Sequence, residues 1–239
     1  ADLERKFGRA RIARELALQV LKIDPRNVNA HILLVYLALY GGQIEEAEHY
    51  SHDAIELDSQ NDEVQLTRAL VLNAQGRCEQ AIASLEDYCR GDVGRANVRV
   101  LVLLSDLYRF SGNLDVAHKC LDRAESLWPG DPSIFLASLR CLATADKYDQ
   151  ILIRYTERRN KYSDEPEVLQ GVAAIMAYAK REHYVREAQS LYKQLTMAVP
   201  DYLMGYLGLG QVSYQLEDFD VAQQAYQHVL HLDPYHQQA

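Results

Sequence analysis

Small and apolar residues return along this chain at a nearly constant interval. An alanine recurs every 34 to 37 residues, with Ile151 once in its place, and these positions are Ala13, Ala47, Ala81, Ala117, Ile151, Ala188 and Ala222. A period of this length is the signature of a repeat architecture, in which each repeat must stack on its neighbours to bury its apolar face.

Larger apolar side chains keep the same phase as the alanine. Three residues before it stand Ile44, Cys78, Leu114, Tyr148 and Phe219, and four residues after it stand Leu85, Leu121, Tyr155, Tyr192 and Tyr226. Residues three and four apart share one face of an α-helix. The spacing therefore predicts a helix whose alanine lies where two backbones approach closely, beside a larger residue that fills the remaining space.

Glycine and proline predict where these helices end. Gly42, Gly76 and Gly112 precede the alanine at a constant offset, where glycine allows a tight turn between two helices. All prolines lie at boundaries between repeats, where a helix must stop or begin: Pro25, Pro129, Pro132, Pro166, Pro200 and Pro234.

The phased positions divide the chain into repeats of two helices within a single domain, residues 1–239. A partial repeat, 1–27, with a helix over roughly 9–22, precedes six repeats at about 28–61, 62–97, 98–131, 132–168, 169–202 and 203–236. The two longest intervals predict insertions within 90–97 and 162–168. The first residue is not Met and no capping helix is visible after Pro234, so we expect a piece of a longer protein.

The phased residues resemble the tetratricopeptide repeat. The last repeat carries Tyr206, Leu209, Gly210, Phe219, Ala222, Tyr226 and Pro234, and the third carries Leu104, Tyr108, Gly112, Leu114, Ala117, Leu121, Ala124 and Pro129. The resemblance implies an all-α fold, a right-handed α-solenoid of helix-turn-helix units. It also implies a concave face, built from the first helix of each repeat, that holds peptides or other proteins.

Offsets from each repeat start give the candidate partner-binding residues of that face: Tyr36, Tyr40, Leu66, Leu70, Arg99, Asp106, Arg109, Arg140, Lys180, Arg181, Gln211 and Tyr214. The early positions are apolar and aromatic, whereas five later ones are cationic against a single aspartate. Such cations favour an acidic partner segment, since arginine can bind a carboxylate in a bidentate manner. Pairing of the arginines with carboxylates on neighbouring helices is the alternative.

Two features of the candidate face have specific readings. Tyr36 and Tyr40 are four residues apart on one helical face, where they serve either as partner anchors or as core.

A subclass of the resembled family clamps the C-terminal carboxylate of chaperone tails with lysine and asparagine. The corresponding positions here are Ile32 and Tyr36, Leu66 and Leu70, and Val102 and Asp106. The clamp is absent from them, so binding of that tail is not expected.

Composition narrows the classes of partner. Hydrophobic residues make up 48% and charged residues 25%, which is typical of a globular protein. The formal net charge of −9 argues against nucleic acid, because phosphate contacts need lysine and arginine. No stretch approaches the roughly 20 apolar residues of a membrane helix. The four cysteines lack CxxC spacing, which favours thiols over a metal site and leans towards a reducing compartment, such as the cytoplasm.

The sequence offers little for catalysis, and we expect neither an enzyme nor a cofactor or metal. His49 with His52, and His228 with His231, have helical spacing but no evident third ligand. The glycines in "YLGLGQ" lie at repeat positions and follow no strand, so they do not form a dinucleotide motif. We therefore expect a protein-interaction scaffold. The alternative is a spacer in a larger machine, such as a bacterial polysaccharide-export or secretion protein, and exposed ends favour self-association.

Overall fold

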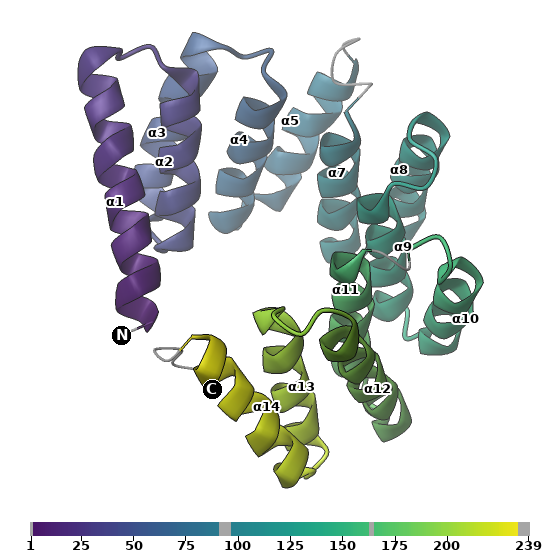
Figure 1. The fold of residues 1–239 in the computed structure, drawn as a ribbon. Coiled ribbons are helices and arrows are strands. Elements are labelled where there is room, and N and C mark those ends of the chain that lie inside the picture. Colours follow the sequence, from purple (N-terminus) through teal and green to yellow (C-terminus); the bar gives the residue numbers. More distant parts are fainter. Residues whose placement is uncertain (1, 91–96, 163–164, 234–239) are drawn as a thin grey trace. The chain divides into compact units, whose positions relative to one another are not determined.

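A computed structural model describes residues 2–90, 97–162 and 165–233, with side chains from Ala10 onward. Every regular element in these ranges is an α-helix (Figure 1). The helices are α1 (Asp2–Ile23), α2 (Val28–Tyr40), α3 (Ile44–Leu57), α4 (Asp62–Ala74), α5 (Cys78–Arg90), α7 (Val98–Phe110), α8 (Leu114–Leu127), α9 (Pro132–Thr144), α10 (Tyr148–Arg158), α11 (Pro166–Ala177), α12 (Glu182–Ala198), α13 (Leu203–Gln215) and α14 (Phe219–Leu232). Residues 91–96 of the first expected insertion, residues 163–164 of the second, and Pro234 lie outside the described residues.

The helices pack in consecutive antiparallel pairs, in which α2 contacts α3, α4 contacts α5, α7 contacts α8, α11 contacts α12 and α13 contacts α14. We call the earlier helix of each pair its first helix and the later one its second helix; α9 and α10 follow the same order. This is the all-α repeat solenoid that the periodicity predicts. The division into six repeats within one domain stays a prediction.

Asparagine side chains start three of the first helices. Asn27, Asn61 and Asn97 each have an extended backbone, and each side-chain oxygen accepts a hydrogen bond from an amide in the first turn of α2, α4 or α7. Such caps satisfy amides that have no partner inside the helix. α11 instead begins with Pro166, whose missing N–H is not needed there.

The phased alanines lie in the core. Ala47, Ala81, Ala117 and Ala188 are fully buried, and so is Ile151, which stands in the alanine position of its pair. Six of the seven phased positions are buried and Ala13 is partly buried. This burial explains the period, since a larger side chain at a close helix–helix contact must be accommodated by its neighbours.

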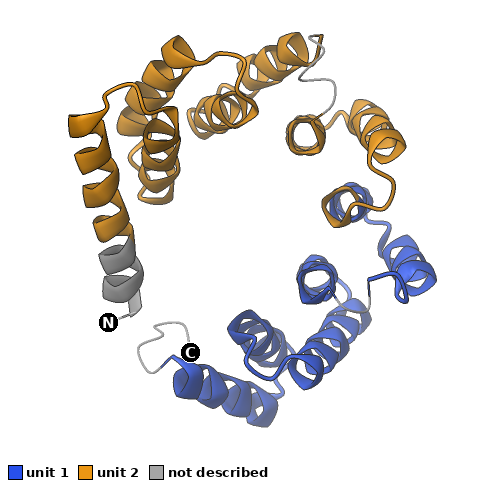
Figure 2. Ribbon diagram, turned by 45° about the horizontal axis from the view of Figure 1, so that its top comes forward, with its two compact units in different colours: residues 1–5, 135–239 blue, residues 6–134 orange. Residues whose placement is uncertain are grey.

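The chain divides into two compact units (Figure 2). Unit 2 spans residues 6–134, and unit 1 comprises residues 135–239 together with 1–5, so the division falls within α9. In unit 1 one large cluster of buried residues joins α9 to α14, with Phe135 stacked on Tyr162 and Tyr148 stacked on Tyr184 at ring-centroid distances of 5.0 and 5.1 Å. Each unit thus has its own core.

Candidate partner-binding grooves

Unit 2 has a groove that we call the first-helix groove, because α2, α4, α7 and the start of α9 form it. It has a volume of about 300 Å³ and is lined by Tyr36, Leu66, Leu70, Arg99, Val102, Leu103, Asp106 and Ser133. Five of the twelve candidate residues therefore meet in one place. The lining is largely aliphatic, with Leu66 only 4% exposed at its base.

One wall of the first-helix groove is a hydrogen-bonded cluster around Glu63 of α4. The Tyr36 hydroxyl and the Arg99 guanidinium both donate to its carboxylate, Arg99 Nη2 at 3.1 Å. Burial and the hydrogen bond to Glu63 raise the pKa of Tyr36 to about 12, although Arg99 opposes this shift. The hydrogen bond to Glu63 in turn raises the pKa of Arg99. The cluster ties together three successive first helices.

A second internal pair lies on α7. Arg109 Nε and Nη2 both donate to Asp106 Oδ1 at 3.1 Å, and the Arg109 guanidinium also lies over the Phe110 ring, 4.1 Å from its centroid. Arg99 therefore follows the alternative of pairing with a carboxylate on a neighbouring helix, whereas Arg109 pairs with a carboxylate of its own helix. Offsets along first helices could not reveal the pairing of Arg99, because its partner Glu63 comes from another helix.

Two of the expected cations do not lie on a first helix. α11 begins at Pro166, three residues before the start that the periodicity predicts, and ends at Ala177. Lys180 and Arg181 consequently lie in the turn before α12, and Arg181 is its N-cap residue. Their placement on a first helix was wrong, because a proline at the first helical position moved the helix and every offset counted along it.

The sequence left open whether Tyr36 and Tyr40 of α2 are partner anchors or core residues, and the structure gives the two tyrosines different surroundings. Tyr36 packs against the buried cluster of Ile32, Ala54 and Val64, while its hydroxyl reaches the groove. Tyr40, at the end of α2, is 64% exposed.

Unit 1 has a groove of a different kind, which we call the amide groove. It has a volume of about 480 Å³, and its lining residues are Gln170, Ala174, Ala177, Tyr178, Tyr192, Met204, Leu207, Gly208, Gln211, Val212 and Gln215. None of these described side chains carries a charge at neutral pH. The candidate Gln211 lies here. Tyr214 packs edge-on against Phe219 outside this lining, and Arg140 lies on α9, also outside it.

Gly208 shapes the floor of the amide groove. A Cβ atom on Gly208 would lie 2.3 Å from the ring of Tyr192, which is buried at the base. Burial raises the pKa of Tyr192 to about 12, so its hydroxyl stays neutral. The groove exists because glycine and alanine stand where longer side chains would fill it.

Within the described part of the chain, no three His, Cys, Asp or Glu side chains are placed to hold a metal ion. The histidine pairs have other contacts: His49 lies 3.7 Å from Asp53, and His228 stacks on Tyr206. None of the described helices is both long and apolar enough to span a membrane.

Comparison with known proteins accords with this architecture. The tetratricopeptide repeat profile matches residues 32–95 and 172–236, which is more than half of the sequence. The chain belongs to the tetratricopeptide repeat family. The family is generally a non-catalytic scaffold for protein interactions. No match was found among curated proteins.

Several solved structures share the fold of this tetratricopeptide repeat chain. A tetratricopeptide repeat protein from Parabacteroides merdae is 14% identical, with a TM-score of 0.65 over 97% of this chain and 90% of its own. PilF from Pseudomonas aeruginosa is 18% identical, with a TM-score of 0.54 over 90% and 96%. The Cut9–Hcn1 hetero-tetramer of the APC/C gives 13% identity and a TM-score of 0.58 over 98% and 45%. At these identities the likeness concerns the fold alone.

Several lining residues were not among the candidates: Leu103, Ser133, Gln170, Tyr178, Tyr192, Met204 and Gly208. A helix start at Pro166 would have placed Gln170 and Ala174 on the correct face, because proline favours the first helical position. Tyr192 comes from a second helix, so offsets along first helices could not reveal it.

Proposed function

We propose that the chain is a protein-interaction scaffold that binds an apolar partner segment, in a peptide or a helix, in the first-helix groove. The observation that carries this proposal is the aliphatic lining of Leu66, Leu70, Val102 and Leu103 between the two polar clusters. Partly exposed aliphatic side chains beside fixed hydrogen-bonding groups give a partner both buried area and register.

The polar walls of the first-helix groove are suited to select the partner, but they attract an acidic partner only weakly. Arg99 and Arg109 already pair with Glu63 and Asp106, so an acidic partner segment must compete with carboxylates of the chain itself. We therefore propose that the apolar residues of the partner supply most of the affinity. An acidic flank adds to the association rate rather than to the strength of the complex.

Site-specific photo-cross-linking tests this proposal. A benzoylphenylalanine at Leu103, inside the groove, is expected to cross-link a partner in lysate of the source cell, and the same residue at Leu127, 47% exposed on α8, is the matched control. The partner segment identified is then titrated as a synthetic peptide against the purified chain. Leu70→Gln with Val102→Gln should weaken its binding at least about tenfold, whereas Leu127→Gln should not.

Equal binding of that peptide by the Leu70→Gln, Val102→Gln variant would exclude the groove as its site. Cross-links at Leu127 alone would have the same meaning. Absence of any groove cross-link would favour the spacer function, in which the helices only separate other domains.

Self-association is a further proposal, supported by α1. This helix exposes Ile12, Leu16, Val20 and Ile23 at helical spacing, with Ile23 87% exposed. A second copy is one partner that such a stripe can bury. Sedimentation velocity over a hundredfold range of concentration should show a dimer that Leu16→Glu abolishes. A monomer throughout would end this proposal.

A further inference from the structure

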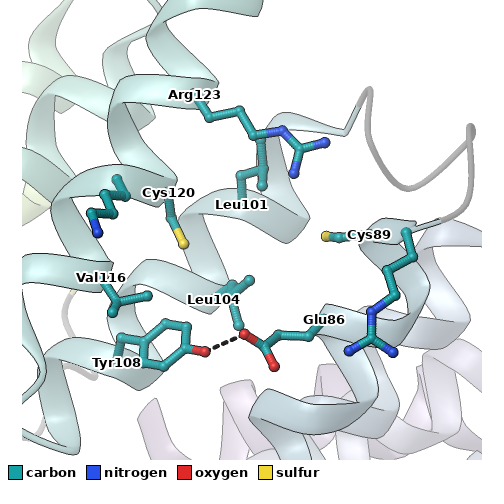
Figure 3. A pocket seen from close by; sticks show the side chains of 10 residues that line it. Glu86, Cys89, Leu101, Leu104, Tyr108, Val116, Cys120 and Arg123 are labelled. Atoms are coloured by element: carbon teal, nitrogen blue, oxygen red, sulfur yellow. Dashed lines mark hydrogen bonds between the residues drawn. The ribbon is translucent and has the colours of Figure 1, made fainter.

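A third depression lies on the second helices of unit 2, and we call it the second-helix pocket (Figure 3). It has a volume of about 360 Å³ and is formed by α5, α7 and α8, with the lining Glu86, Cys89, Arg90, Leu101, Leu104, Tyr108, Val116, Lys119, Cys120 and Arg123. Leu101 and Leu104 are 1% and 4% exposed and form an apolar base. Cys89 and Cys120 lie on opposite walls of this pocket (Figure 3).

This pocket lies on the face of α7 opposite the first-helix groove. Leu101, Leu104 and Tyr108 of α7 contribute to the pocket, whereas Arg99, Val102, Leu103 and Asp106 of the same helix contribute to the groove. With about 100° of rotation per residue, the two sets point in nearly opposite directions. A ligand of the pocket therefore need not touch the groove.

The charges of the second-helix pocket are not balanced as they are in the groove. Lys119 and Arg123 are exposed, one turn apart on α8, and among the described residues neither side chain has a hydrogen bond or an ion pair. The carboxylate of Glu86 accepts from the Tyr108 hydroxyl, and Arg90 pairs with Asp87 at 3.1 Å. In a chain of net charge −9, this is a local excess of positive charge.

The two thiols do not compensate that excess. Burial raises the pKa of Cys120 to about 11 and also raises that of Cys89, although Arg123 acts in the opposite direction on both. A raised thiol pKa keeps the neutral form at physiological pH. The pocket therefore presents two cations that no described carboxylate pairs with, beside an apolar base and two neutral, polarisable thiols.

We propose that the second-helix pocket docks an acidic segment of a partner protein, with a Glu or Asp carboxylate on Lys119 and Arg123 and an adjacent apolar side chain on Leu101 and Leu104. Charge complementarity carries the choice of occupant. A carboxylate on an apolar stem suits a lining that combines the cations of α8 with an apolar base, while Glu86, which also lines the pocket, repels a doubly charged phosphate more strongly than a carboxylate. The proposal does not rest on the first-helix groove, which uses other residues.

The test compares two capped pentapeptides, acetyl-Ala-Leu-Glu-Leu-Ala-amide and its Gln counterpart, by NMR titration of the ¹⁵N-labelled chain. The Glu peptide is expected to shift amides of α5 and α8 and to bind at least about fivefold more tightly than the Gln peptide. The difference should shrink as salt rises, because exposed charges are screened. It should vanish in Lys119→Gln, Arg123→Gln.

The matched control is Arg186→Gln with Lys193→Gln. It also removes one arginine and one lysine charge from a second helix, but from α12, outside the pocket. This variant should retain the preference for the Glu peptide. Octanoate, which combines a carboxylate with an apolar chain but has no peptide backbone, is titrated in the same way.

Cys120 gives a second readout, since an occupied pocket should slow its alkylation by iodoacetamide while leaving Cys78, outside this lining, unchanged. Equal binding of the Glu and Gln peptides, or shifts confined to other helices, would overturn the proposal. Binding of octanoate without binding of the Glu peptide would also overturn it and assign the pocket to a free aliphatic carboxylate.

Discussion

The first-helix groove of unit 2 and the amide groove of unit 1 are both built on first helices, yet they are made in opposite ways. In unit 2, long side chains form the walls, and the charged ones are held by partners such as Glu63. In unit 1, the space comes from side chains that are missing, at Gly208, Ala174 and Ala177, and the polar groups are glutamine amides. One repeat framework thus yields a groove with fixed ion pairs and another without charge.

The turns between paired helices differ in the opposite sense, since here glycine stands in unit 2 and residues with side chains stand in unit 1. Unit 2 uses Gly42, Gly76 and Gly112, whose φ values of 70 to 81° suit glycine. Unit 1 places Asp146 and Glu217 in this conformation, at φ 57° and 59°. A side chain in the left-handed region is strained. Three substitutions, one in each groove and one in a turn of unit 1, test these contrasts.

The largest effect is expected for Gly208→Ala. The new Cβ would clash with the buried Tyr192 ring, so we expect the free energy of unfolding to fall by about 2–3 kcal/mol despite the better helix propensity of alanine. Urea denaturation measures it. Gly41→Ala is the control, because its nearest contact is a flexible glutamine side chain at 3.3 Å. A loss below about 0.5 kcal/mol for Gly208→Ala would show that Tyr192 moves freely.

A smaller effect is expected for Tyr36→Phe, which removes the hydrogen bond to Glu63 from unit 2. The loss should be about 1 kcal/mol at pH 7, since Arg99 still satisfies the carboxylate. In the folded chain the Tyr36 pKa is raised to about 12 from 10.0. Its contribution is complete below pH 10 and is lost as the pH rises towards 12.

Wild type and Tyr36→Phe should therefore converge in stability between pH 10 and pH 12, as measured by urea denaturation at each pH. The control is Tyr40→Phe, whose exposed ring should leave stability unchanged within about 0.5 kcal/mol. A constant difference between wild type and Tyr36→Phe up to pH 12 would mean that Glu63 does not hold the phenol.

The smallest effect is a gain in stability for Glu217→Gly. Relief of the left-handed strain should exceed the entropic disadvantage of glycine, for a net stabilisation of about 0.5–1 kcal/mol. The reverse exchange in unit 2, Gly112→Ala, should destabilise by a similar amount. Thermal unfolding of both variants measures the pair, and a loss of stability for Glu217→Gly would contradict the strain.

The sequence predicted the fold from few positions. Alanine spacing located the helix contacts, and Gly42, Gly76 and Gly112 located turns, because both depend on local geometry that recurs in every repeat. The residues that line the grooves could not be predicted in the same way, because they depend on contacts between separate helices and on where each helix starts. The pairing of Arg99 with Glu63 joins separate helices, and the start of α11 at Pro166 shifted the offsets that placed Lys180 and Arg181.

The second-helix pocket could not be predicted from first-helix offsets, since its cations lie on α8. The one available sign was Lys119 and Arg123, four residues apart around Cys120, and such spacing is common on any exposed helix. Only the packing of α5 against α7 reveals that these charges share a cavity.

Because α7 lines both the first-helix groove and the second-helix pocket, a movement of this helix would affect ligand binding at both sites. If α7 is rigid and stationary, a ligand in the first-helix groove and one in the second-helix pocket bind with independent affinities. If one ligand tilts α7, the lining of both sites changes together, and each ligand alters the affinity of the other by the same factor. The coupling free energy between the two ligands would then show how strongly α7 links the two sites.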